Sequence, residues 1–290
     1  MSGNFVESRK QTEIVNSARE PGTNHSRMAR LVIDPVFSCK GVRNRVWWFL
    51  GYPDQALRGV EELMVRVRIE KYDPRTVCDA LISATVCYGY CGQVAEVLRT
   101  AQEVIEVCDQ YGLMAERQWG IIGRGWARTW DTPTEDGIAE MRASIDFLSS
   151  LGVSMFVNTM YTAWLAERLL AAGHLEEAGR RIERALEFSS LTGHGIVDAD
   201  LHRLRSEVLH RSGASAEQVE ASLNRAIEIA RSQQARSLEL RATLSWSRIL
   251  RGQGRNREAL SALSEIYNWF SEGFDTADLA EVNTILKEWS

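Results

Sequence analysis

The sequence lacks several features that would place it in a well-marked class of protein. It has no apolar run of the roughly 18 residues that a membrane-spanning helix needs, and its first thirty residues contain no signal-peptide core. Its formal net charge of −5 argues against a general nucleic-acid-binding surface, which needs a basic excess. These absences predict a cytoplasmic protein that has no membrane partner and does not bind nucleic acid directly.

Cysteine and proline are both scarce. The odd number of cysteines and the lack of a Cys-x-x-Cys pair predict buried free thiols in a reducing compartment. The five cysteines are Cys39, Cys78, Cys87, Cys91 and Cys108. All five prolines lie outside or at the edges of apolar helical stretches, and none follows Pro133. Because proline breaks helices, the second half of the chain can be helical almost throughout.

The motifs of common enzyme classes are also absent. The chain has no Gly-x-x-x-x-Gly-Lys-Ser/Thr phosphate loop, no Gly-x-Ser-x-Gly nucleophile elbow and no His-Glu-x-x-His zinc motif. His202 and His210 could share a helix face, and Cys87 and Cys91 are i, i+4 neighbours, but helical histidines and core cysteines are the favoured interpretation. The glycines of residues 120–125 have no flanking strand and predict close helix packing. We therefore expect no enzyme activity, no metal and no cofactor.

What the sequence does contain is a repeat of 40 or 41 residues. A small or apolar residue recurs, in most copies with apolar residues four and seven positions later, which is the spacing of one helix face. The first members of the six copies are Ala56, Val97, Ile138, Ala178, Val219 and Ala259. Because the spacing is so regular, it indicates six copies of one supersecondary unit.

Glycines mark the turn before most of these anchor residues. A glycine just past the end of a helix accepts the left-handed conformation that closes it. The turn glycines are Gly51, Gly92, Gly173, Gly213 and Gly254, and the third copy has residues 131–134 in the same place. Each copy is therefore predicted to form a helix, a turn and a second helix.

A unit of this length holds two helices of about 15 residues and two short turns, and neither helix can bury its apolar face alone. The fold prediction is all-α: an α-solenoid of about six tetratricopeptide-like helix–turn–helix repeats with a C-terminal capping helix. The predicted repeats span roughly 31–71, 74–112, 114–152, 154–193, 196–234 and 236–272, and the cap spans 275–289.

Two segments depart from the regular pattern. Residues 1–30 are polar and lack periodicity, which predicts a mobile tail or a loosely attached segment. Residues 64–69 alternate like a strand, but Val60, Leu63 and Val67 continue a helical face, so a helix is predicted there.

Four stretches carry a family resemblance. Residues 48–57, 237–242, 253–259 and 268–279 resemble the helical-repeat sensor region of large bacterial signalling ATPases. Such proteins carry an adenylate/guanylate cyclase domain or a winged-helix DNA-binding domain, then a nucleotide-binding domain, then the sensor. The resemblance covers roughly residues 31–289. Since the phosphate loop is missing, it implies a free-standing sensor domain, a natural truncation or a gene remnant.

Repeat arrays of this kind present a groove lined by the first helix of each repeat, and arginine and tryptophan most often anchor binding there. The alternative interpretation is that the arginines are only solvated. The predicted groove residues are Arg45, Arg124, Trp130, Trp164, Arg203, Arg241 and Arg248. The Lys and Asn set with which some tetratricopeptide domains clamp a terminal carboxylate is not found.

The leading functional hypothesis is a non-catalytic scaffold that binds a protein or peptide, such as an ATPase, a cyclase or a DNA-binding regulator. A sensor that binds a metabolite in the groove and a non-functional remnant of a larger regulator are the alternatives. An enzyme with a site assembled across repeats is the weakest. The sequence leaves the oligomeric state open.

Overall fold

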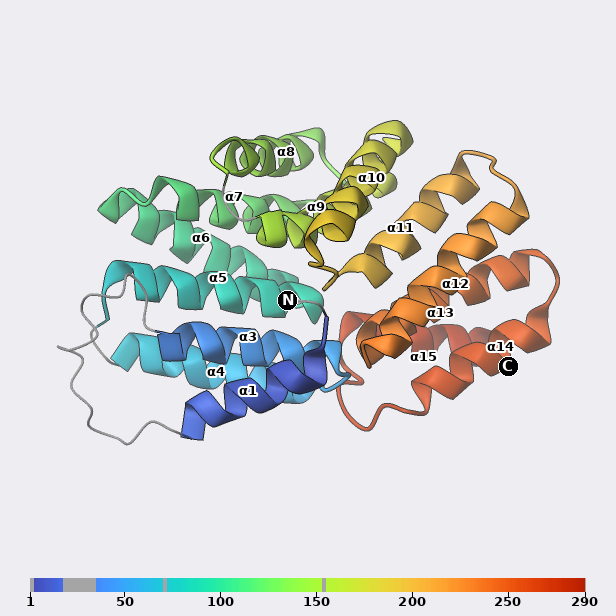
Figure 1. Ribbon diagram of the computed structural model, residues 1–290, viewed down its shortest axis with the longest axis horizontal. Helices are drawn as coiled ribbons and strands as arrows, with labels where there is room; N and C mark the ends of the chain where they lie inside the picture. The colour runs from blue at the N-terminus through green and yellow to red at the C-terminus, as the bar shows by residue number, and fades with distance from the viewer. Residues whose placement is uncertain (1–2, 18–34, 70–71, 153–154, 290) are drawn as a thin grey trace.

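The computed structural model describes residues 3–17, 35–69, 72–152 and 155–289, and within these ranges every regular element is an α-helix (Figure 1). The helices are α1 (Phe5–Ser17), α3 (Pro35–Phe49), α4 (Pro53–Ile69), α5 (Pro74–Tyr90), α6 (Val94–Tyr111), α7 (Met114–Arg128), α8 (Glu135–Ser150), α9 (Met155–Ala172), α10 (Leu175–Thr192), α11 (Asp198–Arg211), α12 (Ala216–Ser232), α13 (Arg236–Gly252), α14 (Asn256–Tyr267) and α15 (Ala277–Trp289). The predicted all-helical repeat array is confirmed. None of these helices is long and apolar enough to cross a membrane.

The six anchor positions of the repeat are all buried, each in the second helix of a hairpin. Each of these side chains is 2% exposed or less. The anchors are Ala56, Val97, Ile138, Ala178, Val219 and Ala259. At Ala56, Ala178 and Ala259 the small side chain lets the second helix approach its neighbours closely. The ambiguous segment 64–69 belongs to α4, so the helical prediction is confirmed over the strand alternative.

Local chemistry explains where the helices begin and end. The predicted turn glycines all have positive φ angles, from 71° at Gly92 to 93° at Gly51. Asp73 caps α5 by accepting hydrogen bonds from the backbone N–H groups of Arg75 and Thr76 at 3.0 and 3.1 Å. Ser215 and the Gln218 side chain form a capping box before α12.

The glycine-rich stretch 120–125 lies inside α7 and allows close helix contact, as predicted. A β-carbon at Gly123 would lie 2.8 Å from Thr85 Cγ2 of α5 and 3.2 Å from Ala101 Cβ of α6. Both distances are too short for ordinary van der Waals contact, so this position has no room for a side chain.

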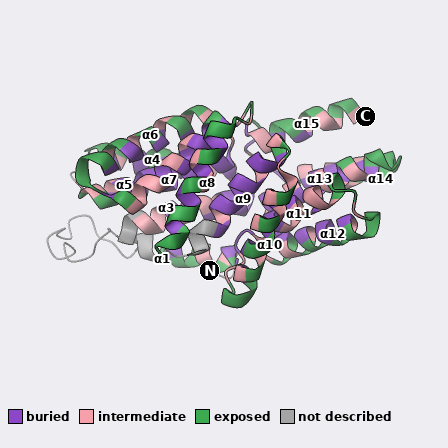
Figure 2. Cartoon of the chain, turned by 90° about the horizontal axis from the view of Figure 1, so that it is seen from above, coloured by how far each residue is buried: buried purple, intermediate pink, exposed green. Residues whose placement is uncertain are grey.

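The first helices form an inner layer and the second helices an outer one. The first helices contact one another in chain order, α3 with α5 and so on to α13, whereas the second helices contact first helices. Figure 2 shows buried residues where helices face their neighbours and exposed residues on the outside. One apolar cluster runs from Phe5 to Leu238, and a second, which includes Leu263, is covered by Leu279 and Val282 of α15.

All five cysteines are free, and Cys39 is the one that is not buried.

The two ends of the array meet, so the inner layer closes into a ring of first helices (Figure 1). Ser237 Oγ of α13 donates a hydrogen bond to the Trp48 carbonyl of α3 at 2.6 Å. Glu272 accepts from the backbone N–H of Gln55 at 3.1 Å and from its side-chain amide at 3.3 Å. The sequence pattern does not predict this closure, because it depends on the twist that accumulates over all six repeats.

The predicted mobile tail over residues 1–30 is wrong for residues 5–17. These residues form α1, which packs on α3, and Phe5 is 1% exposed. The Phe5 ring stacks on Phe49 at a centroid distance of 4.5 Å, and the Arg9 guanidinium lies 4.8 Å from the Trp47 ring. One buried aromatic side chain and one cation–π contact attach an otherwise polar helix. Residues 18–30 lie outside the described residues.

Candidate functional site

A cavity of about 150 Å³ opens in the inner layer, among the first helices of four successive repeats. Its walls come from α3, α5, α7 and α9 and from the segment that leads into α11. The lining residues are Ser38, Val42, Arg45, Val46, Phe49, Asp79, Ile82, Ser83, Val86, Trp119, Met160, Tyr161 and Ile196. No single repeat builds this cavity, so it exists only because the repeats stack.

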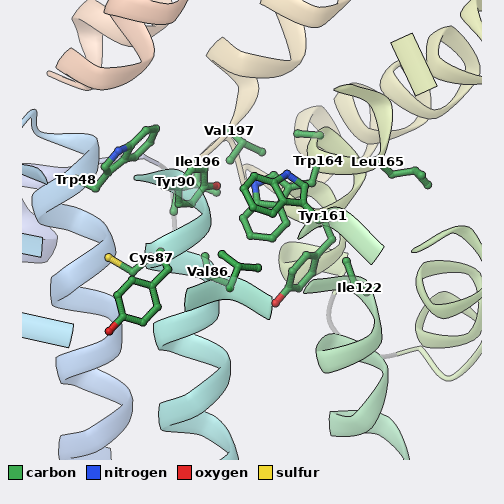
Figure 3. Packing of buried hydrophobic residues seen from close by; sticks show 14 of the residues in the cluster. Trp48, Val86, Cys87, Tyr90, Ile122, Tyr161, Trp164, Leu165, Ile196 and Val197 are labelled. Carbon is green, nitrogen blue, oxygen red and sulfur yellow. The ribbon is translucent and has the colours of Figure 1, made fainter. Parts of the chain in front are cut away.

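The cavity has a partly exposed mouth and a buried apolar floor. Ser38, Arg45 and Asp79 at the mouth are half-buried, whereas Val86 and Tyr161 on the floor are buried. Figure 3 shows Tyr161, Val86 and Ile196 close together among the aromatic residues of the core. A group that enters the mouth would therefore exchange water for an apolar surface.

Asp79 supplies a carboxylate at the mouth. Ser38 Oγ of α3 donates to Asp79 Oδ2 of α5 at 2.7 Å. Burial raises the pKa of Asp79, and this effect outweighs the hydrogen bond from Ser38 and the positive charge of Arg45, both of which lower it. Among the residues that the structure describes, Asp79 has no close cationic partner.

Arg45 supplies a guanidinium whose hydrogen-bonding capacity is mostly unused. Arg45 Nη1 donates to Ser83 Oγ at 3.3 Å, and this is its one hydrogen bond within the described residues. A guanidinium has five N–H donors in a fixed fork that suits carbonyl and carboxylate oxygens. Arg45 can therefore bind an acceptor on a ligand without giving up an ion pair.

Two aromatic polar groups on the wall are also unsatisfied by the described part of the chain. Tyr161 is 1% exposed and its hydroxyl makes no hydrogen bond there, while Trp119 Nε1 is buried without a partner. Burial raises the pKa of Tyr161, so its hydroxyl stays neutral at physiological pH. A buried donor without a partner, such as Trp119 Nε1, is uncommon in native proteins and points to a ligand or solvent.

A second group of charged side chains on the inner ring lies outside the cavity, and its members form ion pairs with one another. We call Glu167, Asp200, Arg203, Arg241 and Asp278 the ion-pair cluster. Arg203 Nε lies 2.6 Å from Asp200 Oδ1 and Arg203 Nη2 lies 3.3 Å from Glu167 Oε1, while Arg241 Nε lies 2.8 Å from Asp278 Oδ2. Burial would raise the pKa of Asp200, but the charges of Arg203 and Arg241 hold it below its ordinary value.

Arg241 also links the cluster to the far end of the chain. Its guanidinium carbon lies 4.9 Å from the centre of the Trp48 ring of α3, and its Nη2 donates to the Tyr90 carbonyl of α5 at 3.4 Å. Arg241 thus joins α13 to α3, α5 and α15 across the closure of the ring. The positive charge of Arg241 is therefore paired within the protein and stabilises the fold.

The structure separates the seven predicted groove residues. Arg45 lines the cavity, whereas Arg203 and Arg241 belong to the ion-pair cluster. Arg124 pairs with Glu140 of α8 at 2.9 Å, and Arg248 pairs with Glu281 of α15 at the edge of another, more open cleft.

The two predicted tryptophans lie in or beside the core. Trp164 is 4% exposed and packs on Tyr90 and Trp126. Trp130 lies under the Arg168 guanidinium at 5.3 Å. Ligand binding by any of the seven residues stays a prediction.

Sequence reasoning missed Asp79, Trp119 and Tyr161. A signal for Asp79 was present, because Ser38 and Asp79 are 41 residues apart, which is one repeat. Pairs of polar residues one repeat apart on first helices are neighbours in a solenoid. No comparable signal marks Tyr161, whose position at the cavity follows from how four repeats pack.

Comparison with known proteins adds a fold likeness and one sequence match. No protein-family model matches the chain. Among solved structures, it is similar to a Rap protein crystallised in complex with Competence and Sporulation Factor, with a TM-score of 0.60 and 10% identity over 99% of this chain and 94% of the Rap chain. Among curated proteins, it is 34% identical over 122 residues to an uncharacterized protein of Rhizobium meliloti (strain 1021). That match covers 42% of this chain and 12% of the relative, which is therefore a much longer protein.

Proposed function

We propose that this chain is a scaffold that binds a peptide, or a peptide segment of a partner protein, on its inner ring. The observation that carries the proposal is the cavity, where an apolar floor is surrounded by Arg45, Asp79 and Tyr161 with hydrogen-bonding capacity to spare. Unsatisfied polar groups around an apolar pocket are the usual form of a ligand site.

The size of the cavity favours one side chain of a longer ligand over a whole metabolite. Sites for small molecules usually enclose about 300–1,000 Å³. The 150 Å³ available here compares with a protein cavity that binds a benzene molecule. An anchor residue of a peptide would fit, and the remainder of the peptide would lie along the first helices.

Two similarities to known proteins support a regulatory role for this binding. The Rap protein of similar fold was crystallised in complex with Competence and Sporulation Factor, and the Rhizobium meliloti relative is far longer than the matched segment. We therefore propose that the scaffold works in the cytoplasm with a signalling ATPase, a cyclase or a DNA-binding regulator, as the resemblance of residues 31–289 implies. It needs no cofactor for this role.

Selection from a random heptapeptide library tests the proposal. Enriched peptides should share an apolar residue and bind with a measurable Kd in isothermal titration calorimetry. Val42→Phe narrows the cavity and should weaken their binding about tenfold or more. Val107→Phe is the control, because Val107 is half-buried in α6 and lies outside the cavity.

The metabolite alternative predicts the opposite pattern. In that case no peptide is enriched, and a small molecule stabilises the protein in a thermal-shift screen. A ligand at 100 times its Kd adds about 2.7 kcal/mol of stability, which is easily measured. Equal peptide affinity for the Val42→Phe variant and the unsubstituted protein would also contradict the proposed site.

A further inference from the structure

We propose that the cavity recognises one apolar amino-acid residue through both its side chain and its main chain. The side chain occupies the apolar floor, a main-chain carbonyl or carboxylate oxygen binds to Arg45, and a main-chain N–H or ammonium group binds to Asp79. The inference rests on the proposed function in one respect, namely that the cavity is the ligand site.

The shape of the cavity selects the side chain. The floor is formed by buried apolar groups such as Phe49, Val86 and Ile196. A volume of 150 Å³ fits a branched aliphatic or a phenyl group. A charged group on this floor would lose its hydration without a matching partner.

The polar groups at the mouth select the main chain. Arg45 and Asp79 line the same mouth with opposite charges, yet they form no ion pair with each other within 4 Å. Arg45 offers unused donors, and Asp79 has one oxygen, Oδ1, outside its hydrogen bond with Ser38. A separated donor and acceptor match the C=O and N–H groups on either side of one amino-acid residue.

The pair of charges also discriminates against simpler ligands. An anion that binds to Arg45 would meet the like charge of Asp79, and a cation that binds to Asp79 would meet that of Arg45. A ligand that presents an acceptor and a donor together avoids both costs. An amino-acid main chain does so in two forms, as a free zwitterion or as a residue within a peptide.

Calorimetric titration with defined probes separates these two sources. The probes are free L-leucine, N-acetyl-L-leucine amide, 4-methylpentanoate, which lacks the amino group, and 3-methylbutylamine, which lacks the carboxylate. We expect at least one of the first two probes to bind and both truncated probes to bind at least tenfold more weakly. Binding of the zwitterion alone identifies a free amino acid as ligand, and binding of the amide identifies a residue within a chain.

Substitutions at the mouth of the cavity provide a second test of the inference. Arg45→Gln and Asp79→Asn should each weaken the binding of the stronger probe about tenfold to a hundredfold, the usual effect of losing a hydrogen bond to a charged group. Arg128→Gln is the matched control, because Arg128 lies exposed on the first helix α7 and outside the cavity, and it should leave affinity unchanged. Circular dichroism checks that each variant is folded.

The outcomes distinguish this inference from the proposed function. Library peptides that bind equally to the unsubstituted protein, Arg45→Gln and Asp79→Asn would overturn the inference and leave peptide binding intact. Binding of free L-leucine without any enriched peptide would overturn the proposed function and support the inference. Truncated probes that bind as well as L-leucine and the amide, or no binding by any probe or peptide, would overturn the inference.

Discussion

The two sides of the inner ring use the same residue type in opposite ways. On the side formed by α9, α11, α13 and α15, Arg203 and Arg241 each contact carboxylates at 2.6–2.8 Å. On the side formed by α3 and α5, Arg45 contacts one hydroxyl at 3.3 Å and is not paired with Asp79. A guanidinium that already has its partners stabilises the fold, whereas one that lacks them is available to a ligand.

This difference shows how a structural arginine on a concave surface can be told from one that is available to a ligand. Position on the groove does not distinguish a structural arginine from a binding one, because both kinds face inward. The number of N–H donors left after the protein's own acceptors are counted does distinguish them. By this measure the ion-pair cluster belongs to the closure of the ring, and the cavity is the proposed site of recognition.

The largest expected effect is the loss of Arg241. Arg241→Ala leaves the buried carboxylate of Asp200 and the half-buried carboxylate of Asp278 without their shared cation, and it removes the contact with Trp48. Removing one partner of a buried ion pair costs about 3–5 kcal/mol. Urea denaturation measures this loss, and a change below about 1 kcal/mol would mean that the cluster does not hold the ring closed.

A second substitution tests the C-terminal region without touching its charges. Leu263 is fully buried in the small apolar cluster under α15, so Leu263→Ala should cost about 2–5 kcal/mol through the cavity it leaves. Ala178→Trp, at an anchor position, should cost about 1–3 kcal/mol or more through overpacking. Unchanged melting temperatures for both would contradict the repeat register.

The smallest expected effect lies at the mouth of the cavity. Burial raises the pKa of Asp79, so the folded protein holds this proton to a higher pH than the unfolded chain does. The contribution of Asp79 to stability is therefore complete below its unfolded pKa of about 3.9 and declines as the pH rises through the folded value. Asp79→Asn should gain stability relative to the unsubstituted protein between pH 3 and pH 7 in urea titrations. A relative loss over that range would show that Asp79 is held by a partner after all.

The sequence predicted the parts of the fold that depend on short-range pattern. The anchors, such as Ala178 and Val219, and the turn glycines follow from helical periodicity and backbone conformation, and both were correct. The closed ring could not be predicted, since small twists between repeats add up over the whole chain. The α1 helix was missed because few of its residues, chiefly Phe5 and Arg9, attach it to the array.

The site was predicted less well than the fold. Arg45, Arg203 and Arg241 were grouped together because each faces inward, and the pattern of one helix cannot reveal its partners on the next. The separation in sequence contained part of the answer, since Asp200 precedes Arg241 by 41 residues and Asp278 follows it by 37. An acidic residue about one repeat away from an arginine is thus an indication of a structural ion pair in such arrays.

The most direct test compares Arg45→Gln with Arg203→Gln in the same urea denaturation experiment, without any ligand. Both remove one guanidinium from the inner ring and leave a polar side chain of similar shape. The account predicts that Arg203→Gln lowers the free energy of unfolding by about 3 kcal/mol, while Arg45→Gln changes it by no more than about 0.5 kcal/mol. Equal losses in the two variants would contradict the distinction between a structural and a binding side of the ring.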